Sequence, residues 1–165
     1  MLDRVASRSL HSHRPLTAFV GIIASDTDPS DSDGNRWTPE RADASAELIG
    51  LRVLVVEDEF LLGIMTEEEL LSLGCEVLGP FTTLSAASEA IRTEEFDIAI
   101  LDINLDGQMV FPLADRLVER GIPFLFLTGY ASLTIPERLR PAPRLTKPLQ
   151  RASLVKAMRR IVSQA

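Results

Sequence analysis

Acidic side chains follow two apolar segments of this sequence, at the point where each segment ends. The run Asp97–Asp102 (DIAILD) is typical of a buried strand that brings the Asp102 carboxylate to its carboxyl end. Leu51–Val56 (LRVLVV) is a second such strand, and Glu57 and Asp58 follow it directly. Because ligands in parallel sheets bind outside the carboxyl ends of the strands, we expect these three carboxylates to form part of one site.

A hydroxyl and an ammonium group follow two later segments in the same way. Pro123–Thr128 (PFLFLT) ends in a hydroxyl, and a short apolar segment leads into Lys147. Mg²⁺ prefers oxygen ligands and binds through one or two carboxylates plus phosphate oxygens, which suits Glu57, Asp58 and Asp102. A carboxylate can also accept a phosphoryl group covalently, and a lysine and a hydroxyl stabilise the phosphoryl oxygens. The set predicts a site for a metal ion and a phosphoryl group, with Asp102 as the nucleophile.

The composition indicates a globular protein and argues against several other classes. The chain has 165 residues, 45% of them hydrophobic, which allows one domain of ordinary size. A net charge of -7 argues against direct DNA binding, which needs a basic surface. The lone Cys75 excludes an internal disulfide, and no apolar run is long enough to insert into a membrane. We therefore expect a cytoplasmic protein.

Residues 1–50 differ in composition from the rest of the chain. The run Ser25–Gly34 is polar and contains Pro and Gly, so it cannot bury enough surface to offset the entropy of ordering. We expect a flexible N-terminal extension over residues 1–50 and a folded domain over residues 51–165. The Arg-containing first residues could also suggest a targeting peptide, but we favour a tail or a misassigned start codon. The apolar stretch Ala18–Ile23 comes late and is short for a targeting peptide.

From Leu51 onward, strand-like runs alternate with helical patterns. This alternation predicts an α/β fold, a doubly wound five-stranded parallel sheet flanked by helices. Asp58 is placed to cap the first helix, and Gly74 to end it. Asp106 and Gly107 predict a turn within a loop over Ile103–Gln108. A second strand is predicted over Cys75–Gly79. Helices are predicted over 58–73, Leu84–Thr93 and Met109–Arg120, where Pro112 is tolerable only in the first turn. At most two helical turns are expected within Tyr130–Arg140, and the last helix, Leu149–Ser163, places near one face Leu154, Ala157, Met158 and Ile161.

These residues, in this order, resemble the receiver domain of two-component response regulators, a CheY-like, flavodoxin-like fold. The resemblance runs from Leu51 to Ile161 and rests on Glu57-Asp58, Asp102, Thr128 and Lys147-Pro148. Ile122–Tyr130 further resembles the "FAT GUY" group of single-domain receivers, with Leu127 where that motif has alanine.

The resemblance implies a role for each site residue. Asp102 would be the phosphoacceptor, Thr128 the switch hydroxyl and Lys147 the phosphate-binding lysine, joined to Pro148 by a cis peptide. The backbone carbonyl of Asn104 would complete the Mg²⁺ ligands, and the side chains of Asn104 and Tyr130 would tune the reaction. Arg144 departs from the family, because many receivers carry an aromatic residue three positions before the lysine. Movement of Tyr130 or its loop is the substitute hypothesis.

The implied function is a phosphorylation-dependent switch. A sensor histidine kinase or histidine phosphotransfer protein would phosphorylate Asp102. Because no output domain follows in the sequence, the signal would pass to an unknown downstream protein by binding or phosphotransfer. One alternative is an interaction module that works without phosphorylation, and a second is a phosphatase with an aspartyl nucleophile. The second alternative normally has an acid where this chain has Asn104. Plainer roles as helix caps, turn formers or a loop lysine stay open for the same residues.

Overall fold

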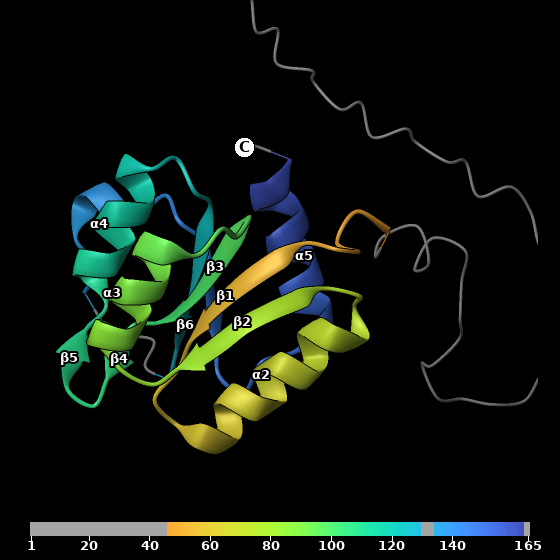
Figure 1. Ribbon diagram of the computed structural model, residues 1–165, viewed down its shortest axis with the longest axis horizontal. Coiled ribbons are helices and arrows are strands. Elements are labelled where there is room, and N and C mark those ends of the chain that lie inside the picture. The colour runs from red at the N-terminus through yellow and green to blue at the C-terminus, as the bar shows by residue number, and fades with distance from the viewer. Residues whose placement is uncertain (1–45, 130–133, 164–165) are drawn as a thin grey trace, which may run out of the picture. The chain divides into compact units, whose positions relative to one another are not determined.

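The computed structural model of the chain describes residues 46–129 and 134–163 (Figure 1). All of these residues belong to one unit, Trp37–Ala165. The predicted flexibility of residues 1–45 lies outside the described residues. Residues 46–50, which the sequence reading placed in the extension, belong to the fold, because Leu48 is fully buried in the core.

Five parallel strands form the central sheet, as predicted. They are β1 (Arg52–Val56), β2 (Glu76–Phe81), β3 (Ile98–Asp102), β6 (Phe124–Thr128) and β7 (Arg144–Thr146). Their order across the sheet is β2-β1-β3-β6-β7. The order reverses direction at β1, so the carboxyl ends of β1 and β3 lie side by side at the switch point, where α/β sheets bind ligands.

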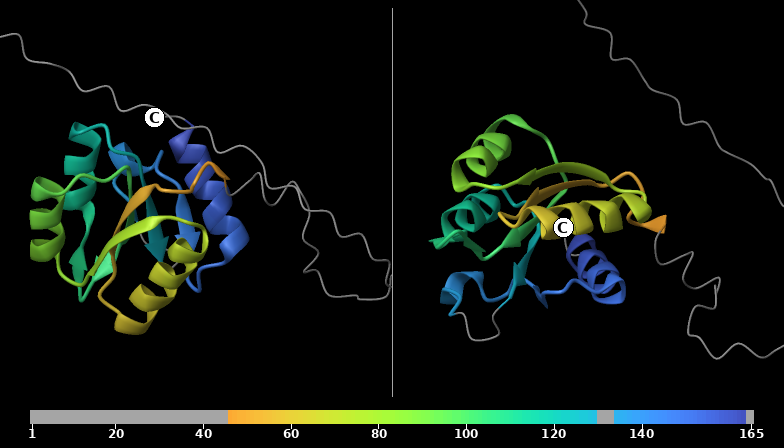
Figure 2. Two further views of the ribbon diagram at one scale, coloured as in Figure 1. Left: turned by 45° about the vertical axis from the view of Figure 1, so that its right-hand side comes forward. Right: turned by 90° about the horizontal axis from the view of Figure 1, so that it is seen from below.

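Helices cover both faces of this sheet. The helices α3 (Leu84–Thr93) and α4 (Phe111–Glu119) lie on one face, and α2 (Phe60–Ser72) and α5 (Arg151–Val162) lie on the other (Figure 2). The α5 residues predicted to share one face are the buried ones, Leu154, Ala157, Met158 and Ile161. Among the described residues, no helix has the length and apolarity needed to cross a membrane.

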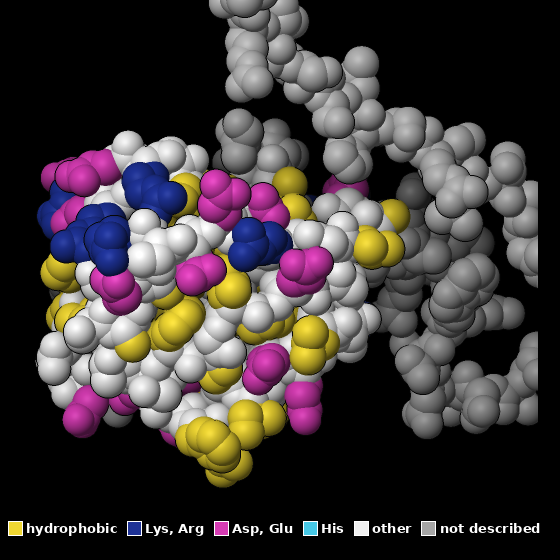
Figure 3. Space-filling view, in the orientation of Figure 1, with side chains coloured by type: hydrophobic (Ala, Val, Ile, Leu, Met, Phe, Trp, Pro, Cys, Tyr) yellow, Lys and Arg dark blue, Asp and Glu magenta, His cyan; other side chains and the backbone are white. Residues whose placement is uncertain are grey.

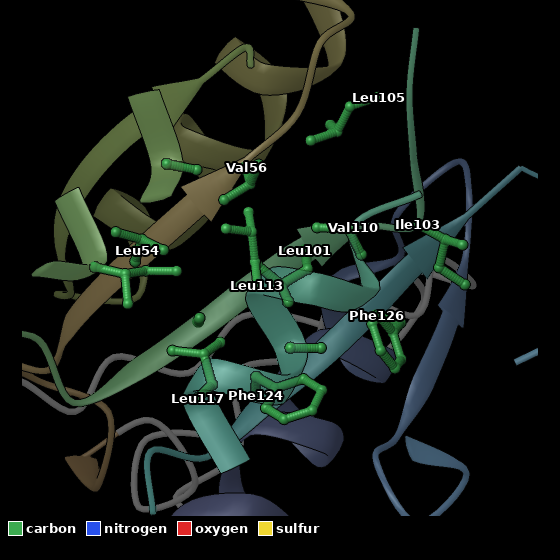
Figure 4. Close-up of a cluster of buried hydrophobic side chains, with 14 of the residues drawn as sticks. Leu54, Val56, Leu101, Ile103, Leu105, Val110, Leu113, Leu117, Phe124 and Phe126 are labelled. Carbon is green, nitrogen blue, oxygen red and sulfur yellow. The ribbon is translucent and has the colours of Figure 1, made fainter. Parts of the chain in front are cut away.

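The strands β1, β3 and β6 are buried on both faces, which explains their nearly continuous apolar sequence. Alternate residues of β1 point to opposite layers: Val53 and Val55 pack with α2 and α5, and Leu54 and Val56 pack with α3 and α4. Figure 4 shows the cluster on the side of α3 and α4, which includes Phe126. The Phe126 ring makes edge-to-face contacts with Phe124 and Phe111, with centroids 5.3 and 6.3 Å away.

The structure corrects the predicted loop after β3. Residues 103–108 were expected to form a loop, but β4 (Asn104–Leu105) and β5 (Gln108–Met109) pair as a small antiparallel hairpin. The expected turn lies at its tip, because Asp106 and Gly107 both have positive φ. Two-residue hairpin loops of the I′ type require this conformation, and Asp-Gly is a preferred sequence for them. Met109 belongs to β5, so α4 begins later than predicted, with Pro112 in its first turn as expected.

Other predicted boundaries differ by a few residues. The second strand continues past Gly79 to Phe81, and the last helix begins at Arg151 instead of Leu149. Before β7, the described residues contain one short 3-10 helix, η1 (Glu137–Leu139), consistent with the expectation of little helix there. Tyr130, the proposed tuning residue, lies outside the described residues.

We expect Phe126→Ala to lower the free energy of unfolding by about 3–5 kcal/mol, because it leaves a cavity beneath the strand that leads to Thr128. The matched change Phe60→Ala removes the same atoms from a side chain that is 69% exposed, and we expect less than about 0.5 kcal/mol. Urea unfolding followed by circular dichroism measures both values. Equal losses would contradict the placement of Phe126 in the core.

Candidate phosphoryl-transfer site

Three carboxylates converge at the carboxyl end of the sheet. Glu57 and Asp58 follow β1, and Asp102 is the last residue of β3. One oxygen from each lies within 4.8 Å of the others, a grouping that can hold a metal ion. Glu57 and Asp102 are buried, whereas Asp58 is partly exposed. The structure therefore brings together the three residues that the sequence placed at the ends of two separate strands.

Lys147 reaches into this cluster from the loop after β7. Its Nζ donates hydrogen bonds to Glu57 Oε1 over 2.8 Å and to Asp102 Oδ2 over 2.7 Å. The second oxygen of Glu57, Oε2, is 2.6 Å from the same nitrogen. The Lys147–Pro148 peptide is cis, as the resemblance implied. One ammonium group thus joins residues that are 90 and 45 positions away in the sequence.

Burial and charge act in opposite directions on these groups. Burial raises the pKa of Glu57, the hydrogen bond and charge of Lys147 lower it, Asp102 raises it, and the pKa stays above its usual value. Burial would lower the pKa of Lys147, but its hydrogen bonds to Asp102 and Glu57 outweigh burial and raise it. The raised pKa of Lys147 keeps its ammonium charged, whereas the raised pKa of Glu57 makes this carboxyl group harder to ionise than an exposed one.

This donor set fits Mg²⁺. The cluster consists of oxygen ligands, and three carboxylates face a single ammonium, so a divalent cation would balance the remaining charge. Glu57 Oε2 is buried and accepts no hydrogen bond of ordinary geometry, although it is close to Lys147 Nζ. A buried oxygen with an unused lone pair is costly unless a cation or its water occupies it.

Asp58 does not cap the helix as predicted. The N-cap residue of α2 is Glu59, and no side chain caps the helix. The Oδ2 atom of Asp58 instead accepts the backbone N–H of Asp106 over 2.8 Å. The carboxylate is therefore engaged by the β4–β5 hairpin, an arrangement that the sequence reading missed. The Asp-Gly turn was the available signal, because it predicts a hairpin when short extended segments flank it.

The remaining predicted residues lie around the cluster. Thr128 is buried at the end of β6, and its carbonyl accepts the N–H of Lys147 over 2.9 Å. Asn104 begins β4 and donates its backbone N–H to Asp102 Oδ1 over 3.3 Å, while its own Oδ1 is buried without a hydrogen bond. Arg144 is exposed on β7. Asp102 pairs with Leu127, so Thr128 lies one residue further along the adjacent strand β6, and Asn104 follows Asp102 in the β4–β5 hairpin.

Two acids outside the cluster have structural partners. Asp97 Oδ2 accepts the N–H of Arg52, and Asp115 pairs with Arg138 at 2.7 Å. The hydrogen bond from Arg138 lowers the pKa of Asp115. Neither acid joins the cluster of Glu57, Asp58 and Asp102.

We expect Asp58→Asn to stabilise the metal-free protein by about 1–4 kcal/mol, because it removes one of three like charges whose oxygens lie within 4.8 Å of one another. The asparagine oxygen can still accept the Asp106 amide. Saturating MgCl₂ should stabilise the wild type by about 2–4 kcal/mol and the variant far less. Urea unfolding with chelator or with MgCl₂ measures both effects. Glu95→Gln, a neutralisation at an exposed position, is the control; equal Mg²⁺ stabilisation of wild type and Asp58→Asn would contradict the metal site.

The raised pKa of Lys147 predicts a pH dependence of stability. Charged Lys147 contributes its full stabilisation to the free energy of unfolding at pH values below 10.5, the usual pKa of lysine. This stabilisation is lost as the pH rises through the higher pKa that Lys147 has in the folded protein. The difference in unfolding free energy between wild type and Lys147→Met should therefore decrease as the pH rises beyond 10.5. Urea titrations in chelator measure it, with Lys156→Met as the exposed control. A difference that is independent of pH would exclude the ion pair.

Known proteins are similar to this chain in sequence, and two of them are also similar in fold. SdrG from Sphingomonas melonis Fr1 is 34% identical, with a TM-score of 0.63 over 70% of this chain and 98% of SdrG. The response regulator PhyR from Brucella abortus is 28% identical, with a TM-score of 0.61 over 74% of this chain and 53% of PhyR. The sensor protein TorS of Escherichia coli K12 is 29% identical over 102 residues, which are 62% of this chain and 11% of TorS.

No family model matches the chain. The similarity to SdrG nevertheless extends over almost the whole of that protein. The sequence identity of 34% shows that the two proteins are related in sequence and not only in fold. The acidic cluster at the carboxyl end of the sheet agrees with it. The chain belongs to the receiver-domain family of two-component response regulators.

Proposed function

We propose that this protein is a single-domain response regulator of the "FAT GUY" type that accepts a phosphoryl group on Asp102. The observation that carries the proposal is the Lys147 ammonium held at 2.7 Å from Asp102 within a buried acidic cluster. The segment Ile122–Tyr130 and the similarity over 98% of SdrG support the single-domain type. The receiver domain would comprise residues 51–165 with 46–50, and the preceding residues would form an extension.

The chain's own groups can carry the transfer. A carboxylate oxygen of Asp102 attacks phosphorus, the P–N bond of a phosphohistidine donor breaks, and the released imidazole takes up a proton. Lys147 then exchanges part of its contact with Asp102 for a phosphoryl oxygen, since an ammonium favours the more highly charged acceptor. The backbone N–H of Asn104 is within reach of the same carboxylate. Thr128 supplies the hydroxyl at the neighbouring strand end.

Glu57, Asp58, Asp102 and the carbonyl of Asn104 would hold Mg²⁺. When bound, the metal neutralises the negative charge that gathers as the phosphoryl group meets the carboxylates. Burial of Glu57 and Asp102 keeps water away and strengthens each charge interaction there. The side chains of Asn104 and Tyr130 would tune how water reaches the acyl phosphate.

The phosphoryl donor would be a sensor histidine kinase or a histidine phosphotransfer protein. Apolar side chains gather at the first turns of α2, directly after the acidic pair, and Figure 3 shows them protruding. Phe60 and Leu61 are each 69% exposed, and Met65 is exposed as well. Such a patch is typical of a surface that binds another protein. Phosphorylation would then change the surface around Thr128 and β7 for a downstream protein.

We expect acetyl phosphate with Mg²⁺ to add one phosphoryl group to the wild type and none to Asp102→Asn, because the amide is not a nucleophile. Intact-protein mass spectrometry measures the adduct, and omission of Mg²⁺ should abolish it. Asp106→Asn, an exposed carboxylate at the hairpin tip where asparagine tolerates the positive φ, should still be labelled.

Labelling of Asp102→Asn at the wild-type level would exclude Asp102 as the phosphoacceptor. No adduct on a folded wild type from acetyl phosphate or from a phosphorylated histidine kinase would favour the alternative of an interaction module that works without phosphorylation.

A further inference from the structure

The β4–β5 hairpin donates two backbone amides to carboxylates of the site. Asn104 N–H points to Asp102 Oδ1, and Asp106 N–H points to Asp58 Oδ2. Asn104 begins β4, and Asp106 is the first residue of the turn that follows this strand, so both amides come from the same arm of the hairpin. The contact between Asp58 and Asp106 joins residues 48 positions apart.

Asp58 needs such a contact more than the other two acids do. Glu57 and Asp102 are fixed by burial and by Lys147, but Asp58 is partly exposed and forms no ion pair among the described residues. Its carboxylate would rotate freely without the amide of Asp106. With Oδ2 held by the amide, the other oxygen remains available to a cation.

The hairpin itself is firmly placed. Leu105 and Val110 are buried in the core on the α3 and α4 side, and Val110 N–H donates to the carbonyl of Ile103. The tip is held by Asp106 at φ 47° and Gly107 at φ 83°, the conformation of an I′ turn. A turn with these backbone angles fixes the orientation of the Asp106 N–H, which points to Asp58 Oδ2.

We propose that the β4–β5 hairpin is a positioning element for the metal site, which orients Asp58 through the Asp106 amide and so sets the affinity for Mg²⁺. The proposal rests on the metal site of the proposed function. Removal of a group that hydrogen-bonds to a metal ligand and so orients it typically weakens metal binding by about 10–100-fold. Gly107 lies in the turn and has no side chain that could bind the metal, so it should control Mg²⁺ binding only through the turn.

The test substitutes the turn and leaves every carboxylate intact. Gly107→Val places a β-branched residue at a positive φ that it does not tolerate, although a Cβ there meets no atom within 4 Å. We expect the dissociation constant for Mg²⁺, measured by isothermal titration calorimetry on the full chain, to rise about tenfold. Gly107→Asn, which accepts a positive φ, should restore the wild-type value.

A matched control separates positioning from general destabilisation. Gly121 also has a positive φ and open space around its Cβ, but it follows α4 at the opposite end of the sheet. Gly121→Val should destabilise the fold without changing the dissociation constant. The Asp106 amide signal in a ¹H–¹⁵N NMR spectrum should shift in metal-free Gly107→Val and stay in place in Gly121→Val.

Each outcome bears on one proposal. Equal Mg²⁺ affinity of wild type and Gly107→Val, with the Asp106 amide displaced, would overturn the role of the hairpin and leave the metal site standing. Weakened binding in both valine variants would overturn it too, because a general loss of stability would then explain the effect. A wild type that binds no Mg²⁺ would instead refute the metal site of the proposed function, and this inference with it.

Discussion

The ion pair of Lys147 with Glu57 and Asp102 is the interaction on which the site depends. Taking carboxylates out of water is costly, and here two of them are buried beside each other. The single ammonium at 2.6 to 2.8 Å makes this burial tolerable without neutralising the whole cluster. Under the proposed function, the remaining negative charge would attract a cation, and the ammonium would turn toward a phosphoryl group. A fully neutralised or fully exposed cluster would lack one of these two properties.

The sheet determines where this ion pair can form. Burial of β1, β3 and β6 on both faces leaves their polar residues only at the strand ends, where backbone hydrogen bonding stops and solvent begins. Because the strands are parallel and β1 pairs with β3, Glu57, Asp58 and Asp102 reach one edge together. Lys147 follows the edge strand β7 and approaches from the side of β6. The apolar core thus fixes the positions of the charged groups at the carboxyl ends of its strands.

The site combines rigid and adjustable parts. Glu57 and Asp102 are held by packing and by Lys147, whereas Asp58 is held by one backbone amide of a surface hairpin. This difference matters because a metal ligand on a partly exposed side chain loses rotational entropy on binding unless another group has already restricted it. The hairpin occupies the side of α3 and α4, and Thr128 and β7 lie toward the other edge of the sheet. A change at Asp102 could therefore affect two neighbouring regions, the β4–β5 hairpin on one side and the strands β6 and β7 on the other.

The sequence by itself determined the fold class, the strand ends and the identity of the acids, hydroxyl and lysine, because buried parallel strands leave a nearly continuous apolar pattern that stops at the functional residues. It also identified the buried face of α5 from the period of its apolar residues. It assigned Asp58 to a helix cap and residues 103–108 to a loop, and both predictions were wrong. Local propensity cannot reveal a hydrogen bond between residues 48 positions apart. Only the tertiary structure decided which carboxylates share Lys147, which oxygen remains without a hydrogen bond, and what orients Asp58, since each depends on distances between segments that the chain brings together only on folding.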